Sequence, residues 1–495
     1  MKRTYRNFAV LFSALLLGAT VGCGSNTETN LPTETTDIPA VSETVTETEA
    51  PSYIDLLPAE VSFPDTNFHI GYVAVSDYST MNECAFTLEE AQGDIINEAI
   101  YQRNLQTSET LGITITAEQM CKSWADMQTA LAKLVKSGDC PYDTVIGPVV
   151  WQFRSSLTDM LIDMNTLDSI DFSHAWWDTD VIKNMYSLGT NNIYFASGDI
   201  NYHDDYGQHC LIFNKKLCDT YDLAYPYQLV LNGKWTYDKL KEYCMNFGLD
   251  LNGDSRMDQN DLFGYIGNTG ALNNVFLPSA GENVITVNDD LTVTLNASDR
   301  LYSVVNSFFT DFENRDVYCI MERELGYDIG NTVFPTGHAL FCGNAMVHLI
   351  ASYRVSMEDD FGILPHPKFD ESQKNYYSML NQVYATAYSI PITNENPEQT
   401  GWILDVMGYY SQDTLYPAVI EKNIKTKAMR DEESIAMLDI LFDSKFYELG
   451  GWGTKIYENI GNLVMKGENT YSSTLEKTEK TTQNEFKELP NAYRN

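Results

Sequence analysis

The sequence predicts an α/β protein of at least two lobes, in which mostly parallel sheets are flanked by helices. Strands and helices alternate along residues 68–147. The chain of 495 residues is long enough for two or three domains or lobes, and its content of 43% hydrophobic residues can fill their cores. Strand patterns late in the chain indicate that it crosses back and forth between two bodies. This composition excludes wholesale disorder.

The first five predicted elements follow one another in the order β-α-β-α-β. The strands are residues 68–75, 113–116 and 143–147, which are rich in β-formers. The helices are residues 94–111, stopped by Gly112, and residues 124–135, ending near Gly138. This alternation predicts a parallel sheet whose ligand sites lie at the carboxyl ends of its strands. The loops at 76–80 and 147–154 therefore belong to the candidate binding edge.

The pattern continues less regularly downstream. Two strands at 192–196 and 210–214 flank a polar loop, and a late strand pair covers 339–348 and 385–391. Helices are predicted at 236–246, with Thr236 as a plausible N-cap, at 298–312 and at 400–411. We assign residues 53–165 and 335–395 to the first lobe, and residues 166–334 and 396–495 to the second.

The amino terminus has the pattern of an export signal. Basic residues precede an apolar run at 8–17, and Cys23 follows directly after Gly22. The run is too short for a comfortable transmembrane helix, which needs about 20 apolar residues. The site resembles a bacterial lipoprotein signal, so residues 1–22 are expected to be removed and Cys23 to be acylated. The alternative is an ordinary secreted protein in which Cys23 is incidental.

The segment after Cys23 favours a surface anchor. Residues 24–52 are dominated by Thr, Glu, Ser and Pro and contain no Lys, Arg or aromatic residue, so they cannot bury enough apolar area to offset the entropy of ordering. We expect residues 23–52 to be a disordered tether that holds the protein at the extracellular face of a cell membrane. The other eight cysteines include no CxxC pair, and we interpret them mainly as small buried hydrophobic residues. A disulfide is the alternative in an exported chain, and the sequence assigns no pairing.

The charge balance limits the classes of partner that we expect the protein to bind. Lys and Arg total 32 against 69 Asp and Glu, which gives a net charge of −37. Nucleic-acid binding depends on clustered Lys and Arg, so DNA, RNA and anionic lipid headgroups are disfavoured as partners. The charge could alternatively serve only to keep an exposed protein soluble.

Four stretches resemble one known family. They are residues 93–104, Trp176-Trp177-Asp178, residues 232–240 with the segment Gly-Lys-Trp-Thr-Tyr-Asp, and residues 361–368 with two prolines. Together they are similar to the extracellular solute-binding proteins of ABC importers, family 1, the carbohydrate-type lipoproteins of Gram-positive bacteria. The resemblance implies a two-lobed, type II periplasmic-binding-protein-like fold with a hinge. It also implies a protein that closes around a small solute and presents it to an ABC permease. We expect the solute to be an oligosaccharide and the protein to be a monomer.

An acidic loop has the spacing of a calcium site. Oxygen-bearing side chains or a backbone carbonyl stand at positions 1, 3, 5, 7, 9 and 12 of a twelve-residue loop; they belong to Asp250, Asn252, Asp254, Arg256, Asp258 and Asp261. Ser255 replaces the turn glycine of an EF-hand, and Asp261 replaces its bidentate Glu. We predict a structural Ca²⁺ here, with a solvated acidic turn that binds nothing tightly as the alternative.

Candidates for the solute site are aromatic and acidic residues at predicted lobe edges. Aromatic rings stack on the apolar faces of sugars, and carboxylates accept hydrogen bonds from hydroxyl pairs. The candidates are Asp77, Tyr78, Trp151, Asp204, Asp205, Tyr206 and Trp452. Each could instead be a core residue, and Trp176-Trp177 is expected to pack between helix and sheet.

The rival functional classes are an enzyme and a surface adhesin or sensor. The sequence has no Gly-x-Ser-x-Gly elbow, zinc motif or glycine-rich phosphate loop, and we predict no catalytic residues. A glycosidase carboxylate pair leaves no sequence spacing and stays open as an alternative. Turnover of a saccharide would distinguish the enzyme, and a permease encoded alongside would distinguish an importer subunit from an adhesin.

Overall fold

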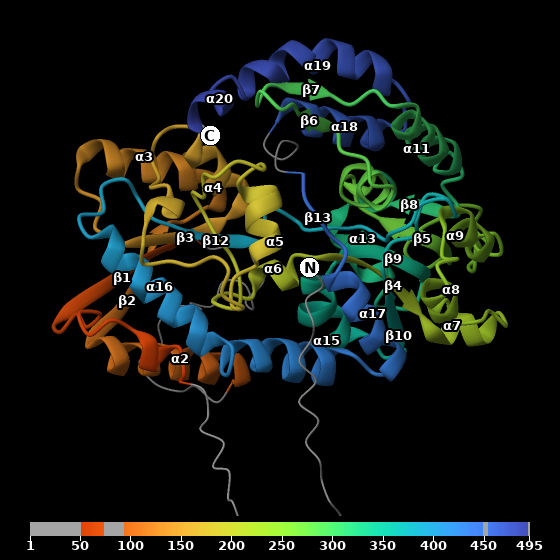
Figure 1. Ribbon diagram of the computed structural model, residues 1–495. Helices are drawn as coiled ribbons and strands as arrows, with labels where there is room; N and C mark the ends of the chain where they lie inside the picture. The colour runs from red at the N-terminus through yellow and green to blue at the C-terminus, as the bar shows by residue number, and fades with distance from the viewer. Residues whose placement is uncertain (1–50, 74–93, 449–453, 494–495) are drawn as a thin grey trace, which may run out of the picture. The chain divides into compact units, whose positions relative to one another are not determined.

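The computed structural model of the protein describes residues 51–73, 94–448 and 454–493, of which those from Ser52 onward belong to one compact unit. The first of its two main sheets has four strands in the order β12-β3-β1-β2 (Figure 1). Strand β1 pairs in parallel with β2 and β3, and β12 is antiparallel to β3. The strands of this sheet are β1 (Thr66–Val73), β2 (Ile113–Cys121), β3 (Thr144–Pro148) and β12 (Thr386–Ser389).

Local sequence signals explain the first sheet. Helix α2 (Ile95–Leu111) begins after Asp94, whose carboxylate accepts hydrogen bonds from the backbone of Ile96 and Asn97. It ends at Gly112, which adopts the left-handed conformation (φ 73°) that glycine favours. Helix α3 (Met127–Ser137) ends in the same way at Gly138. The predicted β-α-β-α-β order and the parallel sheet are confirmed.

The second sheet has five strands in the order β10-β4-β9-β5-β8. Strand β5 runs parallel to β8 and β9, whereas β4 is antiparallel to β9 and β10. The strands are β4 (His209–Asn214), β5 (Phe263–Gly267), β8 (Tyr318–Ile320), β9 (Ala339–Ala345) and β10 (Phe361–Leu364). Two small pairs add β6 (Ile285–Val287) with β7 (Val293–Leu295), and β11 (Ser378–Met379) with β13 (Lys445–Phe446).

Helices cover both sheets, and contacts place several of them. Helices α2, α3, α4 and α16 pack with the first sheet or with one another, and α7, α9, α12 and α17 contact the second. The remaining α-helical bounds are α4 (Val149–Ser156), α5 (Thr179–Val181), α6 (His203–Tyr206), α7 (Lys215–Thr220), α8 (Tyr227–Leu231), α9 (Tyr237–Cys244), α10 (Leu277–Ser279), α11 (Asp299–Asp311), α12 (Met321–Glu324), α13 (Tyr327–Val333), α14 (Met346–His348), α15 (Arg354–Ser356), α16 (Pro397–Ser411), α17 (Glu432–Phe442), α18 (Lys455–Lys466), α19 (Tyr471–Glu485) and α20 (Leu489–Ala492).

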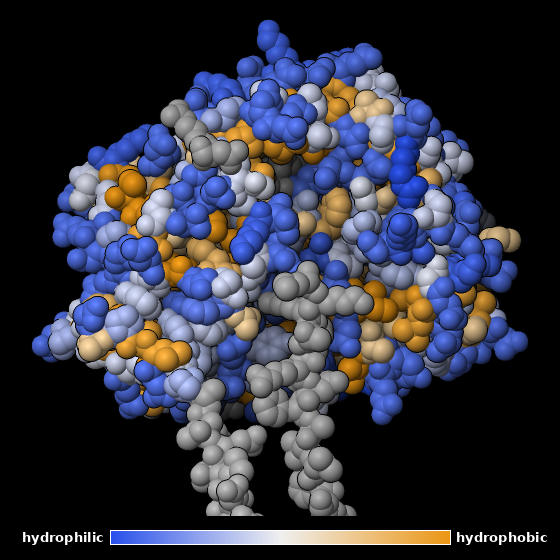
Figure 2. All heavy atoms as spheres, in the orientation of Figure 1, coloured by the Kyte–Doolittle hydropathy of each residue, from blue (hydrophilic) through white to orange (hydrophobic). Residues whose placement is uncertain are grey.

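Short 3₁₀ and π-helical segments complete the chain. The 3₁₀ turns are η1 (Ile54–Leu56), η2 (Trp124–Asp126) and η3 (Met164–Thr166). The π-helical segments are η4 (Ile182–Tyr186), η5 (Leu272–Phe276), η6 (Leu349–Tyr353) and η7 (Pro417–Ala428). Within the described residues, no helix is both long enough and apolar enough to cross a membrane. Figure 2 shows hydrophilic side chains over most of one face, with apolar patches among them.

Three expectations from the sequence are corrected. Residues 192–196 form no strand; only Ala196 makes an isolated bridge, to Tyr388. The late strands do not pair with each other, because β9 lies between β4 and β5 in the second sheet whereas β12 closes the first. Strands β9 and β10 therefore do not belong to the first lobe as assigned. Helix α16, assigned to the second lobe, packs against α2 of the first.

Three segments carry the chain between elements of the two sheets. Residues 196–208 lead from the first sheet to β4, residues 380–385 lead back to β12, and η7 leads from α16 towards α17. The first two lie together, since Asn381 donates its backbone N–H to the carbonyl of Gly207 (2.9 Å) and Gln208 bridges to Leu380. A Cβ at Gly207 would lie 3.0 Å from the backbone nitrogen of Ala385, so this close approach favours glycine.

The carboxyl ends of parallel strands in both sheets lie at this junction. Strand β12 begins at Thr386 beside Pro148, where β3 ends. In the second sheet, β4 begins at His209 beside Ala345, where β9 ends. Because the crossing segments join these points, ligand chemistry is expected between the two edges.

Candidate functional site

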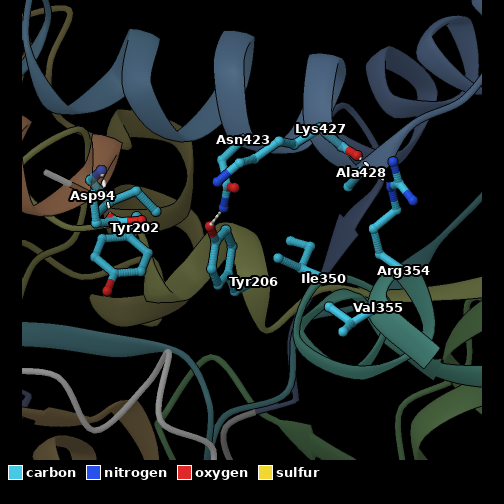
Figure 3. A pocket seen from close by; sticks show the side chains of 10 residues that line it. Asp94, Tyr202, Tyr206, Ile350, Arg354, Val355, Asn423, Lys427 and Ala428 are labelled. Atoms are coloured by element: carbon cyan, nitrogen blue, oxygen red, sulfur yellow. Dashed lines mark hydrogen bonds between the residues drawn. The ribbon is translucent and has the colours of Figure 1, made fainter.

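A cavity of about 390 Å³ lies at the junction of the two sheets (Figure 3). Four parts of the chain line it: the start of α2, the segment around α6, the stretch from η6 to α15, and η7. Its volume falls in the range of small-molecule sites. The fold thus brings together residues that lie more than 300 positions apart in the chain.

Two tyrosines form the inner wall. Tyr202 and Tyr206 are almost fully buried, and their rings meet edge to face with centroids 5.1 Å apart. Asn423 of η7 donates a hydrogen bond from Nδ2 to the phenol oxygen of Tyr206. Burial raises the pKa of the Tyr206 phenol, so the group stays neutral and the wall is polar without charge.

Charged and apolar side chains form the outer wall. Figure 3 shows Asn423 and Lys427 on η7, on the opposite side of the cavity from Ile350 and Val355. Arg354 donates from Nε to the backbone carbonyl of Lys427 at 2.6 Å, which ties α15 to η7. The cavity therefore offers an amide, two cations and an aliphatic surface to a small solute.

The predicted residues Asp204 and Asp205 lie in a buried acidic cluster. The ammonium of Lys445 is 3.3 Å from a carboxylate oxygen of each, and also 3.3 Å from Asp178. Burial raises the pKa of the Asp204 carboxyl well above its usual range; Lys445 opposes this shift and the neighbouring carboxylates add to it. The cluster can accept hydrogen bonds and hold a proton.

The other predicted solute-site residues fall in different places. Tyr206 lines the cavity. Trp151 stands on α4 with its ring centroid 6.0 Å from that of Trp124, and among the described residues its buried indole N–H finds no acceptor. Asp77, Tyr78 and Trp452 lie outside the described residues, as does the predicted acylation site Cys23.

Several residues of the junction were missed from the sequence. Lys445 carries no local motif, and it lies 240 residues from Asp205. Arg354, Asn423 and Lys427 likewise stand in segments without a recognisable pattern. Tyr202 could have been included, because it directly precedes the loop that supplied Asp204 to Tyr206.

The predicted calcium loop has suitable donors, but they are not gathered. Ser255 adopts a left-handed conformation (φ 65°) at the position where an EF-hand has glycine. The two oxygens of Asp261 accept backbone N–H groups of Leu251 and Asp258, each at 2.8 Å. Among the described residues, no group of three or more His, Cys, Asp or Glu side chains is placed to hold a metal ion. The donor types fit Ca²⁺, and binding would require the loop to rearrange.

Comparisons with known proteins identify the fold. No protein-family model matches the sequence, and a search of curated proteins finds no match. The chain is similar to a cyclo/maltodextrin-binding protein solved with maltotetraose (15% identity, TM-score 0.57, 86% of this chain and 97% of that chain). It is also similar to an ABC substrate-binding protein from Listeria monocytogenes solved with cycloalternan (12%, 0.55, 85% and 98%).

A third similar structure is UgpB from Mycobacterium tuberculosis with glycerophosphocholine (12%, TM-score 0.54, 86% of this chain and 99% of that chain). One match is a de novo designed esterase (TM-score 0.58). At these identities the likeness shows the fold alone. The two-lobed α/β fold of solute-binding proteins is confirmed.

Proposed function

We propose that this protein is the extracellular solute-binding subunit of an ABC importer and that it captures a saccharide between its two lobes. The observation that carries the proposal is the fold match, which spans 97% or more of two sugar-bound proteins of this kind. The cavity at the junction of the two sheets supports it, because it combines tyrosines, an amide and charged groups. Such groups bind sugar rings and hydroxyls.

The mechanism is closure about a hinge. The segments 196–208 and 380–385 form one hydrogen-bonded unit between the sheets, and η7 is the third connection. A solute that contacts both edges binds the closed arrangement more tightly than the open one, so it shifts the population towards closure. No covalent step is involved, and we propose no catalytic residue.

The membrane anchor and the other subunits of the importer are part of the same proposal. Acylation of Cys23 would hold the protein at the extracellular membrane face through the tether 23–52, and separate chains would supply the permease and the ATPase. The body would act as a monomer. A Ca²⁺ ion in the loop that starts at Asp250 would have a structural role only, because this loop does not line the cavity.

The test is a thermal-shift screen of the protein without residues 1–22 against neutral and acidic oligosaccharides, polyols and peptides. A ligand that binds only the folded state raises its melting temperature by mass action. We expect one saccharide class to raise it and to be recovered chemically unchanged. A cleaved saccharide would instead establish a glycosidase. If no solute shifts the melting temperature, an adhesin or sensor becomes the better interpretation.

A further inference from the structure

The cavity at the junction carries positive charge in a strongly acidic protein. The chain as a whole has 69 acidic and 32 basic residues. The charged residues that line the cavity, among those the structure describes, are Arg354, Lys427 and Asp94, so cations outnumber carboxylates in this described lining. The described lining of the cavity therefore has the opposite sign of charge from the chain as a whole.

Within the part of the chain that the structure describes, neither cation is paired with a carboxylate. Arg354 uses Nε to bind the backbone carbonyl of Lys427, and among the described residues neither it nor Lys427 has a carboxylate within ion-pair distance. Basic residues close to Lys427 in the chain do form ion pairs. Lys425, also on η7, pairs with Glu421 at 2.8 Å, and Arg430, just after η7, pairs with Asp360. The hydrogen bond at Nε fixes the guanidinium plane and leaves its two terminal nitrogens for a ligand.

The one acidic side chain among the described lining residues, Asp94, already accepts backbone hydrogen bonds. The Asp94 carboxylate caps α2, accepting the backbone N–H groups of Ile96 (2.9 Å) and Asn97 (3.3 Å). The amino terminus of this 17-residue helix carries partial positive charge, which offsets the carboxylate. Asp94 and Asp205 act electrostatically on the Tyr206 side of the cavity, whereas Arg354 and Lys427 supply its positive charge.

We propose that the cavity selects an anionic saccharide, that is, a sugar or polyol bearing a carboxylate or a phosphate; this inference rests on the proposed solute-binding function. Arg354 would hold the anionic group with its terminal nitrogens, and Lys427 would add a second positive charge. Asn423 offers an amide to hydroxyls, and Ile96 and Ile350 offer an apolar surface to the ring. A neutral sugar would leave both cations without a partner.

The test compares matched ligands by isothermal titration calorimetry on the protein without residues 1–22. The probes are a neutral oligosaccharide, the corresponding oligouronate and a sugar phosphate. Each is measured at about 20 and about 200 mM NaCl, because salt screens interactions between charges. We expect at least one acidic probe to bind about tenfold or more tightly than the neutral one, because hydrogen bonds to charged groups are worth that factor. Its affinity should fall at the higher salt concentration.

Variants assign the effect to the cavity. Arg354→Gln and Lys427→Gln should each weaken the acidic probe about tenfold or more and leave a neutral probe unaffected. Lys422→Gln is the matched control, since Lys422 is exposed on the same π-helix and does not line the cavity. The melting temperature of each ligand-free variant checks that folding is retained.

The outcomes separate the two proposals. Tighter binding of the neutral probe, or acidic binding that both glutamine variants retain, overturns the anionic selectivity and leaves the solute-binding function in place. The carboxylate and phosphate probes show which anion is preferred. If no probe in any of these classes binds, both proposals fail together.

Discussion

Asp405 on α16 is predicted to be essential for the stability of the body. Its side chain is 1% exposed. One carboxylate oxygen accepts the indole N–H groups of Trp176 (2.9 Å) and Trp177 (2.7 Å). The other accepts the phenol of Tyr53 (2.7 Å) and Nδ1–H of His174 (3.0 Å). One carboxylate thus holds the residues before β1, the Trp pair and α16 together.

The size of the stability loss follows from the groups that Asp405→Ala would leave without a hydrogen-bond partner. The side chains of Trp176 and Trp177 are buried, so each indole N–H would lose its acceptor away from water. Leaving a buried donor unsatisfied costs about 1–3 kcal/mol, so the pair accounts for about 2–6 kcal/mol. That is a large part of the roughly 5–15 kcal/mol that is typical for a folded protein. Asp405→Asn keeps one acceptor oxygen and should cost less.

Urea unfolding followed by tryptophan fluorescence measures the effect. Asp413→Ala is the control, because Asp413 is exposed just beyond the end of α16; its effect should stay within about 0.5 kcal/mol. A loss below about 1 kcal/mol for Asp405→Ala, with an unchanged slope against urea, would refute the reasoning. It would mean that the indoles find other acceptors once the carboxylate is removed.

Three further predictions concern pH, calcium and the solute site. Burial raises the pKa of Glu448 to about 7. The contribution of this group to stability is therefore complete below its pKa in the unfolded chain, near 4.5, and is lost as the pH rises through 7. Between pH 6 and 8 the free energy of unfolding should drop by about 1 kcal/mol more in the wild type than in Glu448→Gln, and equal drops would contradict this. Millimolar Ca²⁺ should raise the melting temperature, and Asp254→Ala should abolish that rise; a wild type that is insensitive to chelator would retire the calcium site. Asn423→Ala, which removes an amide from the cavity wall, should weaken binding of the saccharide found in the screen by about tenfold, measured by calorimetry, and an unchanged affinity would remove Asn423 from the site.

Local features of the chain were predictable because they depend on near neighbours. Asp94 begins α2 and Gly112 ends it at the positions expected from capping preferences. Thr236 likewise accepts the backbone N–H of Lys239 at the start of α9. The buried Trp176-Trp177 pair agrees with its predicted packing role. The export signal, the lipid anchor and the calcium ion stay predictions.

The sequence by itself determined the α/β class, the first β-α-β-α-β unit and the helix ends, since backbone preferences, capping side chains and hydrophobic period act over a few residues. Only the tertiary structure decided that β9 joins the second sheet and β12 the first. Every residue of both strands is buried, and a strand that is buried on both faces has no exposed face whose pattern would specify its partner. The lining of the cavity also depends on the tertiary structure. Arg354 and Lys427 meet Tyr206 there through the packing of distant segments, and no local pattern in the chain encodes that approach.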